Sequence, residues 1–229
     1  VYRCTMAYRE FGDADICDDP SHCCAIADLD ALAASWGDYG ADYAARVTGA
    51  VNATDSEILL YDGEPIMAVF HAMSGESTSS SADVWGGELP YLVSASAPEG
   101  ETSLENWTST VAVDCGEFAG AVQSKYPLAD FSGLTEEWVE ITETAESGLV
   151  KTVKVGGIIL SGGAVRSICG LKSANFTVKF DGLRFIFTVY GYGHGVGLSQ
   201  YGAKAMANDG LTYDEILEHY YVGTELRGY

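Results

Sequence analysis

The sequence predicts an α+β fold in which helices at both ends of the chain pack against antiparallel strands and hairpins. Apolar residues recur at helical spacing in the first quarter of the 229-residue chain and again after residue 198. Between these regions, short apolar runs alternate with turn residues, which is typical of strands that pair with their neighbours in sequence. We expect the packed elements to form a binding cleft.

The expected helices cluster near the two ends of the chain, with others among the strands. Leu29, Leu32 and Trp36 recur at helical spacing, and Asp38-Tyr39-Gly40 interrupts the helical pattern after them. The helices are expected over about residues 1–10, 28–36, 41–52, 116–125, 158–170, 198–208 and 213–221.

Turn residues mark two hairpins in the middle of the chain. The runs SEILLY and PIMAVFHA flank Asp62-Gly63-Glu64-Pro65, and the runs NFTVKF and LRFIF flank Asp181-Gly182, where glycine adopts a positive φ at little cost. Between the hairpins, a polar segment at 74–90 is expected to be a surface loop that forms one wall of the cleft. Further strands are expected in YLVSASA at 91–97, TVAVDC at 110–115, WVEIT at 138–142 and VKTVKVG at 150–156.

The chain is strongly acidic, and its few cations are unevenly placed. It has 12 Lys+Arg against 33 Asp+Glu, a formal net charge of −21, which argues against nucleic acid as a partner because the phosphates would be repelled. Residues 151–204 nevertheless contain seven basic residues, Arg166 among them, and one acidic residue. This stretch has two interpretations: a surface that holds a carboxylated glycan through residues such as Arg166, or a solvated face that balances the acidic half.

The chain is expected to form one domain over residues 1–229, since no repeat or long linker divides it. The order of elements also allows two packed subdomains, one of about residues 1–97 plus 190–229 and the other of about 98–189. No apolar run approaches the ~18 residues that would cross a bilayer. Because the chain opens at Val1 and has helical character from its first residues, we expect a preceding segment to have been removed.

The strongest local signal is the motif GYGHGVGLSQYGA at residues 191–203. Its glycines at 191, 193, 195 and 197 allow the backbone to pass close to a ligand around His194. Ser199 stands where a helix N-cap would begin, so the amides after it, from Gln200 onward, are candidates to face an anion or a carbonyl oxygen. A purely structural turn is the alternative interpretation.

A second chemical cluster is CDDPSHCC at residues 17–24. Cys17, His22 and Cys23 supply thiolate and imidazole groups that could hold a tetrahedral Zn²⁺, with Cys4 or Cys24 as a fourth ligand. The spacing differs from that of standard zinc fingers. A Cys17–Cys23 disulfide and simply buried thiols stay open as alternatives.

Long motifs in the chain resemble the stage II sporulation protein D family, whose domain is shared with enhancers of cell-wall amidases. They are GEPIMAVFHAMSGEST, DVWGGELPYLVS, SGGAVRSICGLKSANFTV and HGVGLSQYGA, in this order over nearly the whole chain. The resemblance implies a lytic transglycosylase that cuts peptidoglycan glycan strands stripped of stem peptides during engulfment in spore-forming bacteria. It also implies that the expected cleft binds glycan.

The resemblance carries particular residues into that site. His71 with Ser74 would bind the sugar near the scissile bond, and Arg3 would pair with a muramic lactyl carboxylate through its planar fork. A core histidine held by a backbone carbonyl is the alternative interpretation of His71. Some family members have a Cys…His-Cys turn like that at 17–23, preceded by a further His. Phe11 occupies that position here, so the four-ligand zinc site is incomplete in this respect.

The proposed chemistry needs one carboxylic acid, which protonates the glycosidic oxygen and then accepts the proton of the C6 hydroxyl as it closes on C1. In the family this Glu precedes a segment that Tyr2-Arg3-Cys4-Thr5 resembles, so the resemblance implies that it lies upstream of Val1. Glu64, in a turn, and Glu76, after Ser74-Gly75, are weaker candidates, explained by solvation and local variation.

The resemblance leaves open functions of more than one class. A non-catalytic enhancer that binds glycan and activates a cell-wall amidase is the main alternative to the enzyme, and a plain carbohydrate-binding module is a third. Peptidoglycan glycan strands are the expected partner in each case. We expect the protein outside the cytoplasm, anchored in the membrane through an N-terminal segment that this chain does not contain.

Overall fold

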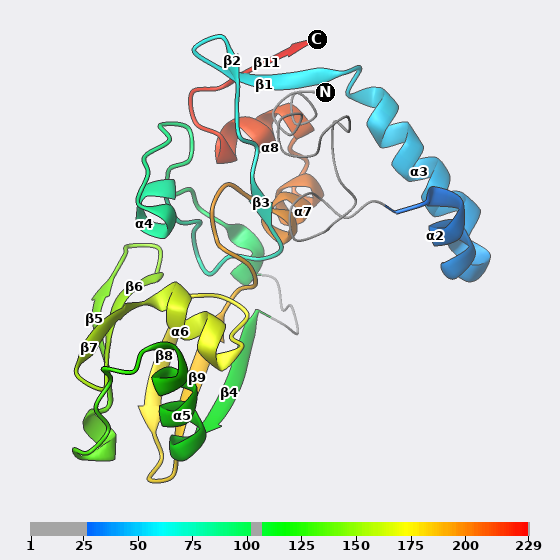
Figure 1. The fold of residues 1–229 in the computed structure, drawn as a ribbon. Helices are drawn as coiled ribbons and strands as arrows, with labels where there is room; N and C mark the ends of the chain where they lie inside the picture. Colours follow the sequence, from blue (N-terminus) through cyan, green and yellow to red (C-terminus); the bar gives the residue numbers. More distant parts are fainter. Residues whose placement is uncertain (1–26, 102–106, 229) are drawn as a thin grey trace, which may run out of the picture. The chain divides into compact units, whose positions relative to one another are not determined.

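The computed structural model describes residues 27–101 and 107–228 of the chain (Figure 1). The chain divides into two compact units, Val1–Ile66 with Leu226–Tyr229, and Met67–Glu225. Helices and largely antiparallel sheets are both present, which confirms the α+β class. The subdomain boundaries expected near residues 97 and 190 stay a prediction, and the helix expected over 1–10 lies outside the described residues.

The first unit contains two helices and a small sheet. Helix α2 (Leu29–Ser35) begins at Asp28, whose carboxylate accepts a hydrogen bond from the Ala31 amide at 2.8 Å, and α3 (Gly40–Ala53) follows after the 3₁₀ turn η1 (Gly37–Tyr39). Both predicted helices are confirmed. Strands β1 (Glu57–Tyr61) and β2 (Glu64–Pro65) form the predicted hairpin, and β11 (Glu225–Gly228) pairs with the other edge of β1.

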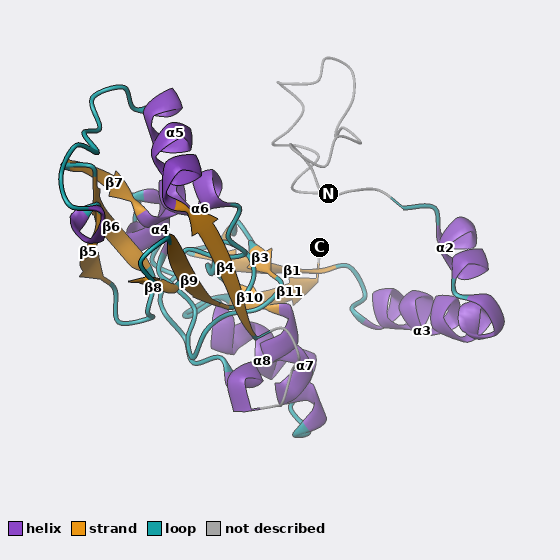
Figure 2. Cartoon of the chain, turned by 90° about the horizontal axis from the view of Figure 1, so that it is seen from below, coloured by secondary structure: helices purple, strands orange, loops and turns teal. Residues whose placement is uncertain are grey.

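The second unit contains two antiparallel three-stranded sheets. One has the order β4 (Thr108–Asp114), β9 (Arg184–Tyr190), β8 (Phe176–Phe180), and the other has the order β5 (Val139–Thr144), β6 (Val150–Val155), β7 (Ile158–Ser161). The hairpin predicted around Asp181-Gly182 is confirmed, with Gly182 at φ +99° and the Asp181 carboxylate accepting the Leu183 and Arg184 amides. Helices α5 (Cys115–Lys125) and α6 (Gly162–Cys169) pack against these sheets (Figure 1 and Figure 2).

One hydrophobic core lies between these sheets and helices. The inward positions of β9 alternate along the strand, so that Phe185, Phe187 and Val189 are all buried while their neighbours are less so. Phe118 of α5 is fully buried, and its ring lies 5.1 Å from that of Phe185. This packed core fixes the frame from which the loops of the unit project.

The remaining elements of the second unit are short. Strands β3 (Phe70–His71) and β10 (Leu198–Ser199) pair in parallel, with His71 opposite Ser199. Helix α7 (Gln200–Asn208) starts directly after β10, and α8 (Tyr213–Tyr220) follows it. The other short elements are α4 (Ser81–Trp85), η2 (Pro98–Glu101) and η3 (Thr135–Glu137).

Several predicted elements differ from the structure. The helix expected over 158–170 is strand β7 followed by α6, because Ile158 and its neighbours pair with β6 and Ser161 caps the helix by accepting the Ala164 amide at 3.1 Å. The strand expected over 91–97 has no regular pairing beyond a bridge between Ser77 and Ser96. The second hairpin strand stops at Pro65, and α4 interrupts the predicted loop at 74–90. Across the described ranges, no helix is long and apolar enough to cross a membrane.

Candidate functional site

The glycine-rich motif runs alongside residues 69–79 of the same unit. All four of its expected glycines adopt positive φ angles, between +70° and +123°. At Gly191 a Cβ atom would lie 2.6 Å from the Met73 carbonyl oxygen, and at Gly193 it would lie 2.7 Å from the Cβ atom of His71. The backbone at these glycines therefore lies close to another segment of the chain, and its close approach to a ligand stays a prediction.

His71 is the most perturbed basic group of the site. Its Nδ1 lies 3.2 Å from the carbonyl oxygen of Val196 and its Nε2 lies 2.6 Å from Oγ of Ser74. Since a carbonyl can only accept, Nδ1 carries the hydrogen and Nε2 accepts the hydroxyl hydrogen of Ser74. Burial, with the nearby His194, lowers the pKa of His71 to about 4, so the ring is neutral at pH 7.

A buried carboxylate that the sequence patterns did not identify holds the other side of Ser74. Oε1 of Glu99 accepts the Ser74 amide at 2.5 Å and the Ser199 hydroxyl at 2.6 Å, and no part of Glu99 is exposed to solvent. Glu99 lies in SAPEGE, a segment whose acidic residues look like an ordinary solvated turn. Only the tertiary structure, which brings residues 74 and 199 to η2, distinguishes this carboxylate from the others.

His194 lies next to His71, with ring centroids 5.6 Å apart. Its Nε2 donates to the Phe70 carbonyl oxygen at 3.0 Å, and its Nδ1 accepts the Val196 amide at 3.1 Å. Burial, reinforced by the charge of Arg166, lowers the pKa of His194. The indole ring of Trp85, which is 47% exposed, lies 5.5 Å from the His194 ring and offers an apolar face beside it.

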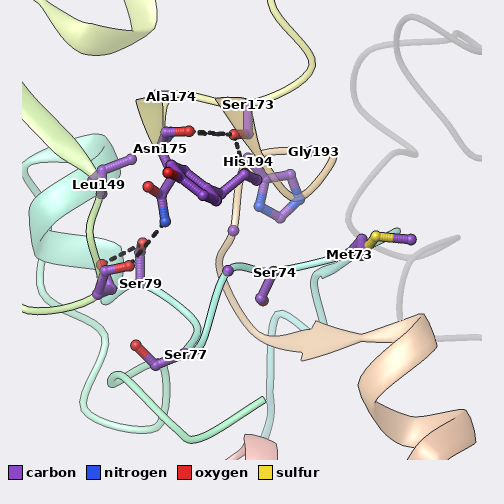
Figure 3. A pocket seen from close by; sticks show the side chains of 14 residues that line it. Met73, Ser74, Ser77, Ser79, Leu149, Ser173, Ala174, Asn175, Gly193 and His194 are labelled. Atoms are coloured by element: carbon purple, nitrogen blue, oxygen red, sulfur yellow. Dashed lines mark hydrogen bonds between the residues drawn. The ribbon is translucent and has the colours of Figure 1, made fainter. Parts of the chain in front are cut away.

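A pocket opens beside these residues (Figure 3). Its walls combine hydroxyl groups with the Asn175 amide and the His194 ring, and none of the lining residues has a carboxyl side chain. Ser79 and Ser147 bond to each other at 2.9 Å, and Nδ2 of Asn175 donates to the Ser147 carbonyl oxygen at 3.1 Å. The serines that line the pocket are Ser74, Ser77, Ser79, Ser147 and Ser173. We call this the hydroxyl pocket.

A second pocket shares Leu149, Ala174 and His194 with the hydroxyl pocket. Two cations line it, and they differ in their partners. Lys151 is bonded to Asp83 at 3.1 Å and to Glu143 at 2.9 Å. Arg166 donates Nε to the Leu171 carbonyl oxygen at 3.3 Å, and no carboxylate of the described residues forms an ion pair with it. We call this the arginine pocket.

The structure brings most of the predicted site residues together. His71, Ser74, His194 and Ser199 are joined by direct contacts or through Glu99, and Arg166 lines the adjoining arginine pocket. Ser199 is the N-cap of α7, as predicted, and accepts the Gly202 amide. Gln200, the first residue of α7, is exposed and lines neither pocket.

Other predicted groups lie outside the described residues, namely Arg3 and the zinc candidates Cys17, His22 and Cys23. The zinc site and its disulfide alternative therefore stay predictions. In the part of the chain that the structure describes, no cluster of three or more His, Cys, Asp or Glu residues could hold a metal ion, and Cys115 and Cys169 are free thiols.

Fold and site together define an α+β domain with a neutral, hydroxyl-lined pocket built around a glycine-rich segment. No family model matches the chain. Stage II sporulation protein D of Bacillus subtilis (strain 168) is 33% identical to it over 195 residues, which are 85% of this chain and 55% of the relative. The chain belongs to the stage II sporulation protein D family, which confirms the resemblance found in its motifs.

Two further relatives match most of this chain. Stage II sporulation protein D of Bacillus amyloliquefaciens is 33% identical over 192 residues, 82% of this chain and 54% of the relative. Amidase enhancer of Bacillus subtilis (strain 168) is 27% identical over 237 residues, 83% of this chain and 34% of the relative. The chain thus spans about half the length, or less, of the curated relatives it matches.

Proposed function

We propose that this domain binds peptidoglycan glycan strands and acts in the remodelling of the cell wall during sporulation. The observation that carries the proposal is the hydroxyl pocket, whose lining serines and Asn175 can donate to and accept from the hydroxyl and acetamido groups of a sugar. Trp85 supplies an exposed aromatic face at its side, on which the apolar face of a sugar ring can pack. The names of the relatives support the sporulation and cell-wall context.

The arginine pocket extends this proposal to glycans that carry carboxylates. The two pockets adjoin each other at His194. The substituents of a glycan strand bound in the hydroxyl pocket therefore extend into the arginine pocket. A muramyl residue without its peptide has a free lactyl carboxylate, and the planar guanidinium of Arg166 is suited to pair with it. Lys151 is less suited, since two carboxylates already neutralise it.

The reaction that we propose for the enzyme is lytic transglycosylation, with this domain holding the strand. Asp83 is the one carboxyl residue among those that line the two pockets, and hydrogen bonding from Ser80, together with Lys151, lowers its pKa. It is therefore ionised near neutral pH and cannot protonate a glycosidic oxygen. The acid must come from outside the two pockets as the structure describes them.

The second candidate is a non-catalytic enhancer that binds glycan and activates a cell-wall amidase. Two observations favour it: the match to a relative named Amidase enhancer, and the hydroxyl pocket without a carboxyl side chain. Both candidates need the same glycan contacts, and they differ in whether the strand is cut. Because peptidoglycan lies outside the cytoplasmic membrane, both also place the protein there.

Binding is tested by calorimetric titration of the 229-residue chain with a tetramer of N-acetylglucosamine and with peptide-free glycan strands. We expect both ligands to bind. The Arg166→Gln substitution should lower the affinity for the strands at least fivefold and leave the affinity for the neutral tetramer within twofold of the wild type. Arg184→Gln is the matched control, because Arg184 is exposed and bonded to Asp181 at 3.0 Å. Failure of both ligands to bind would refute the proposed function; equal loss in the two variants would refute the role of Arg166 alone.

Cutting is tested by mass spectrometry of the glycan strands after incubation. We expect the 229-residue chain to bind them without releasing 1,6-anhydro-muramyl products, because neither pocket offers a carboxylic acid. In a second arm, faster peptide release by a cell-wall amidase in the presence of the chain supports the enhancer. Anhydro products from this chain would contradict the proposed absence of its acid.

A further inference from the structure

We infer that Glu99 is the positioning residue of the site: its buried carboxylate sets the geometry of Ser74 and Ser199, and through Ser74 that of the His71 ring. The inference rests on the proposed function for its effect on binding, although the geometry that it describes stands by itself. Glu99 lines neither pocket, so it cannot touch a ligand there and acts through its neighbours.

One oxygen atom of Glu99 accepts hydrogen bonds from two distant segments of the chain. Oε1 of Glu99 receives the Ser74 amide at 2.5 Å and the Ser199 hydroxyl at 2.6 Å, from residues 25 and 100 positions away in sequence. Both hydrogen bonds involve an ionisable acceptor in the protein interior, where such bonds are short and strong. One carboxylate oxygen thus joins the loop after β3 to the start of α7.

The second step is that the paired strands cannot fix this arrangement themselves. Strands β3 and β10 are two residues long each, and their register places His71 opposite Ser199. A pair so short gains few ladder hydrogen bonds to offset the entropy of ordering. Glu99 bonds to Ser74, three residues after the end of β3, and to Ser199, the last residue of β10, and so supplies the restraint that the ladder lacks.

The third step concerns the space around the carboxylate. At Gly202 of α7, a Cβ atom would lie 2.5 Å from Oε2 of Glu99 and closer still to the Tyr220 hydroxyl. The carboxylate therefore packs directly against the backbone of α7. Ser199, whose hydroxyl hydrogen points to Glu99, keeps a lone pair for the Gly202 amide.

The consequence for the site is a defined direction of the Ser74 hydroxyl. With its amide held by Glu99, Ser74 donates its hydroxyl hydrogen to Nε2 of His71 at 2.6 Å, while Nδ1 of that ring is held by Val196. Ser74 lines the hydroxyl pocket (Figure 3), and its oxygen keeps lone pairs for a further donor. Without Glu99, Ser74 and His71 would lose this fixed relation.

The test compares Glu99→Gln, Glu99→Asp and Glu99→Met by tetramer affinity and by the ¹⁵N chemical shifts of the His71 ring. Gln keeps an oxygen in the place of Oε1, so we expect affinity within about twofold and an unchanged His71 signal. Asp is too short to reach both serines, and Met has no oxygen, so we expect at least tenfold weaker binding and a shifted Nε2 signal. Val153→Ala, a core change far from these contacts, controls for general destabilisation.

The outcomes separate the inference from the proposed function. If folded Asp and Met variants bind as the wild type does and leave the His71 signal unchanged, Glu99 has no positioning role. If the Met variant does not fold, the Asp variant decides. If the wild-type chain binds no glycan while the His71 signal still follows the Glu99 substitutions, the positioning role stands and the proposed function fails.

Discussion

At the scale of single residues, burial decides the chemistry of the two histidines. His71 is 4% exposed and sits between the Val196 carbonyl and the Ser74 hydroxyl, which leaves no room to solvate an added proton. Protonation would also reverse the hydrogen bond with Ser74, whose hydroxyl would have to turn and accept from Nε2. The site therefore holds neutral imidazoles, which suits the recognition of uncharged sugar groups that we propose.

The depressed pKa of His71 predicts a pH dependence of stability. The unfolded chain binds a proton near pH 6.5, whereas the folded chain does so only near pH 4, so the free energy of unfolding falls as the pH drops from 6.5 to 4. Between pH 7 and pH 5 we expect a loss of about 2 kcal/mol from this residue. Urea unfolding of the wild type and of His71→Gln at both pH values measures it.

The comparison with His71→Gln isolates the histidine, because the carboxylates titrate in both proteins. The variant should be less stable at pH 7, where it lacks the neutral ring, and should lose less stability on acidification. Equal slopes for the two proteins would show that His71 is protonated in the folded state at pH 5 and that its burial is less effective than its 4% exposure implies.

At the scale of elements, some structures are determined by the local sequence and others by tertiary contacts. Asp62-Gly63 and Asp181-Gly182 turns were predictable because their backbone demands are local, and both hairpins are present. The segment 158–161 was not, since IILS fits a helix or a strand equally well until β6 provides an edge. The role of Glu99 could not be predicted for the same reason, because the residues next to it in the sequence do not indicate its contacts with Ser74 and Ser199.

The glycine-rich segment gives the element-scale prediction. Gly191 is buried at φ +74°, and a side chain there would meet the backbone of Met73 and Ser74 within 2.7 Å. Gly191→Ala should therefore lower the free energy of unfolding by at least about 2 kcal/mol, through backbone strain and overpacking. Thermal or urea unfolding measures the change, and loss of glycan binding should accompany it.

Gly120 provides the matched control for this substitution. It is exposed within helix α5, and a Cβ atom there would meet nothing within 4 Å. Gly120→Ala should thus raise the free energy of unfolding by about 0.5–1 kcal/mol, since alanine loses less entropy in a helix. A Gly191→Ala protein as stable as the wild type would mean that the segment can move away from residues 73 and 74.

At the scale of the whole molecule, the chain is strongly acidic, whereas one pocket of the candidate site is lined by the cation Arg166. The net charge is −21, so the acidic residues repel one another in the compact state, and residues 47–124 contain no Lys or Arg to offset this repulsion. Within the described ranges, the cations of the basic stretch are partly used in pairs, Lys151 with Asp83 and Glu143, and Arg184 with Asp181. The sequence predicted this imbalance, but only the structure separates Arg166, which faces a pocket, from cations that balance nearby acids.

This opposition predicts that salt acts on stability and on binding with opposite signs. Raising NaCl from 0.01 to 0.15 M shortens the Debye length from ~30 to ~8 Å, which screens the self-repulsion of the acidic chain. We expect the melting temperature at pH 7 to rise by about 2–4 °C, equivalent to roughly 1 kcal/mol. Over the same range the affinity for peptide-free glycan strands should fall severalfold, because the attraction between Arg166 and a carboxylate is screened as well, whereas the affinity for the neutral tetramer should stay unchanged.

At the isoelectric point the effect of salt on the melting temperature should vanish. A melting temperature that stays constant or falls with salt at pH 7 would show that local pairs, rather than net charge, govern the electrostatics of the fold.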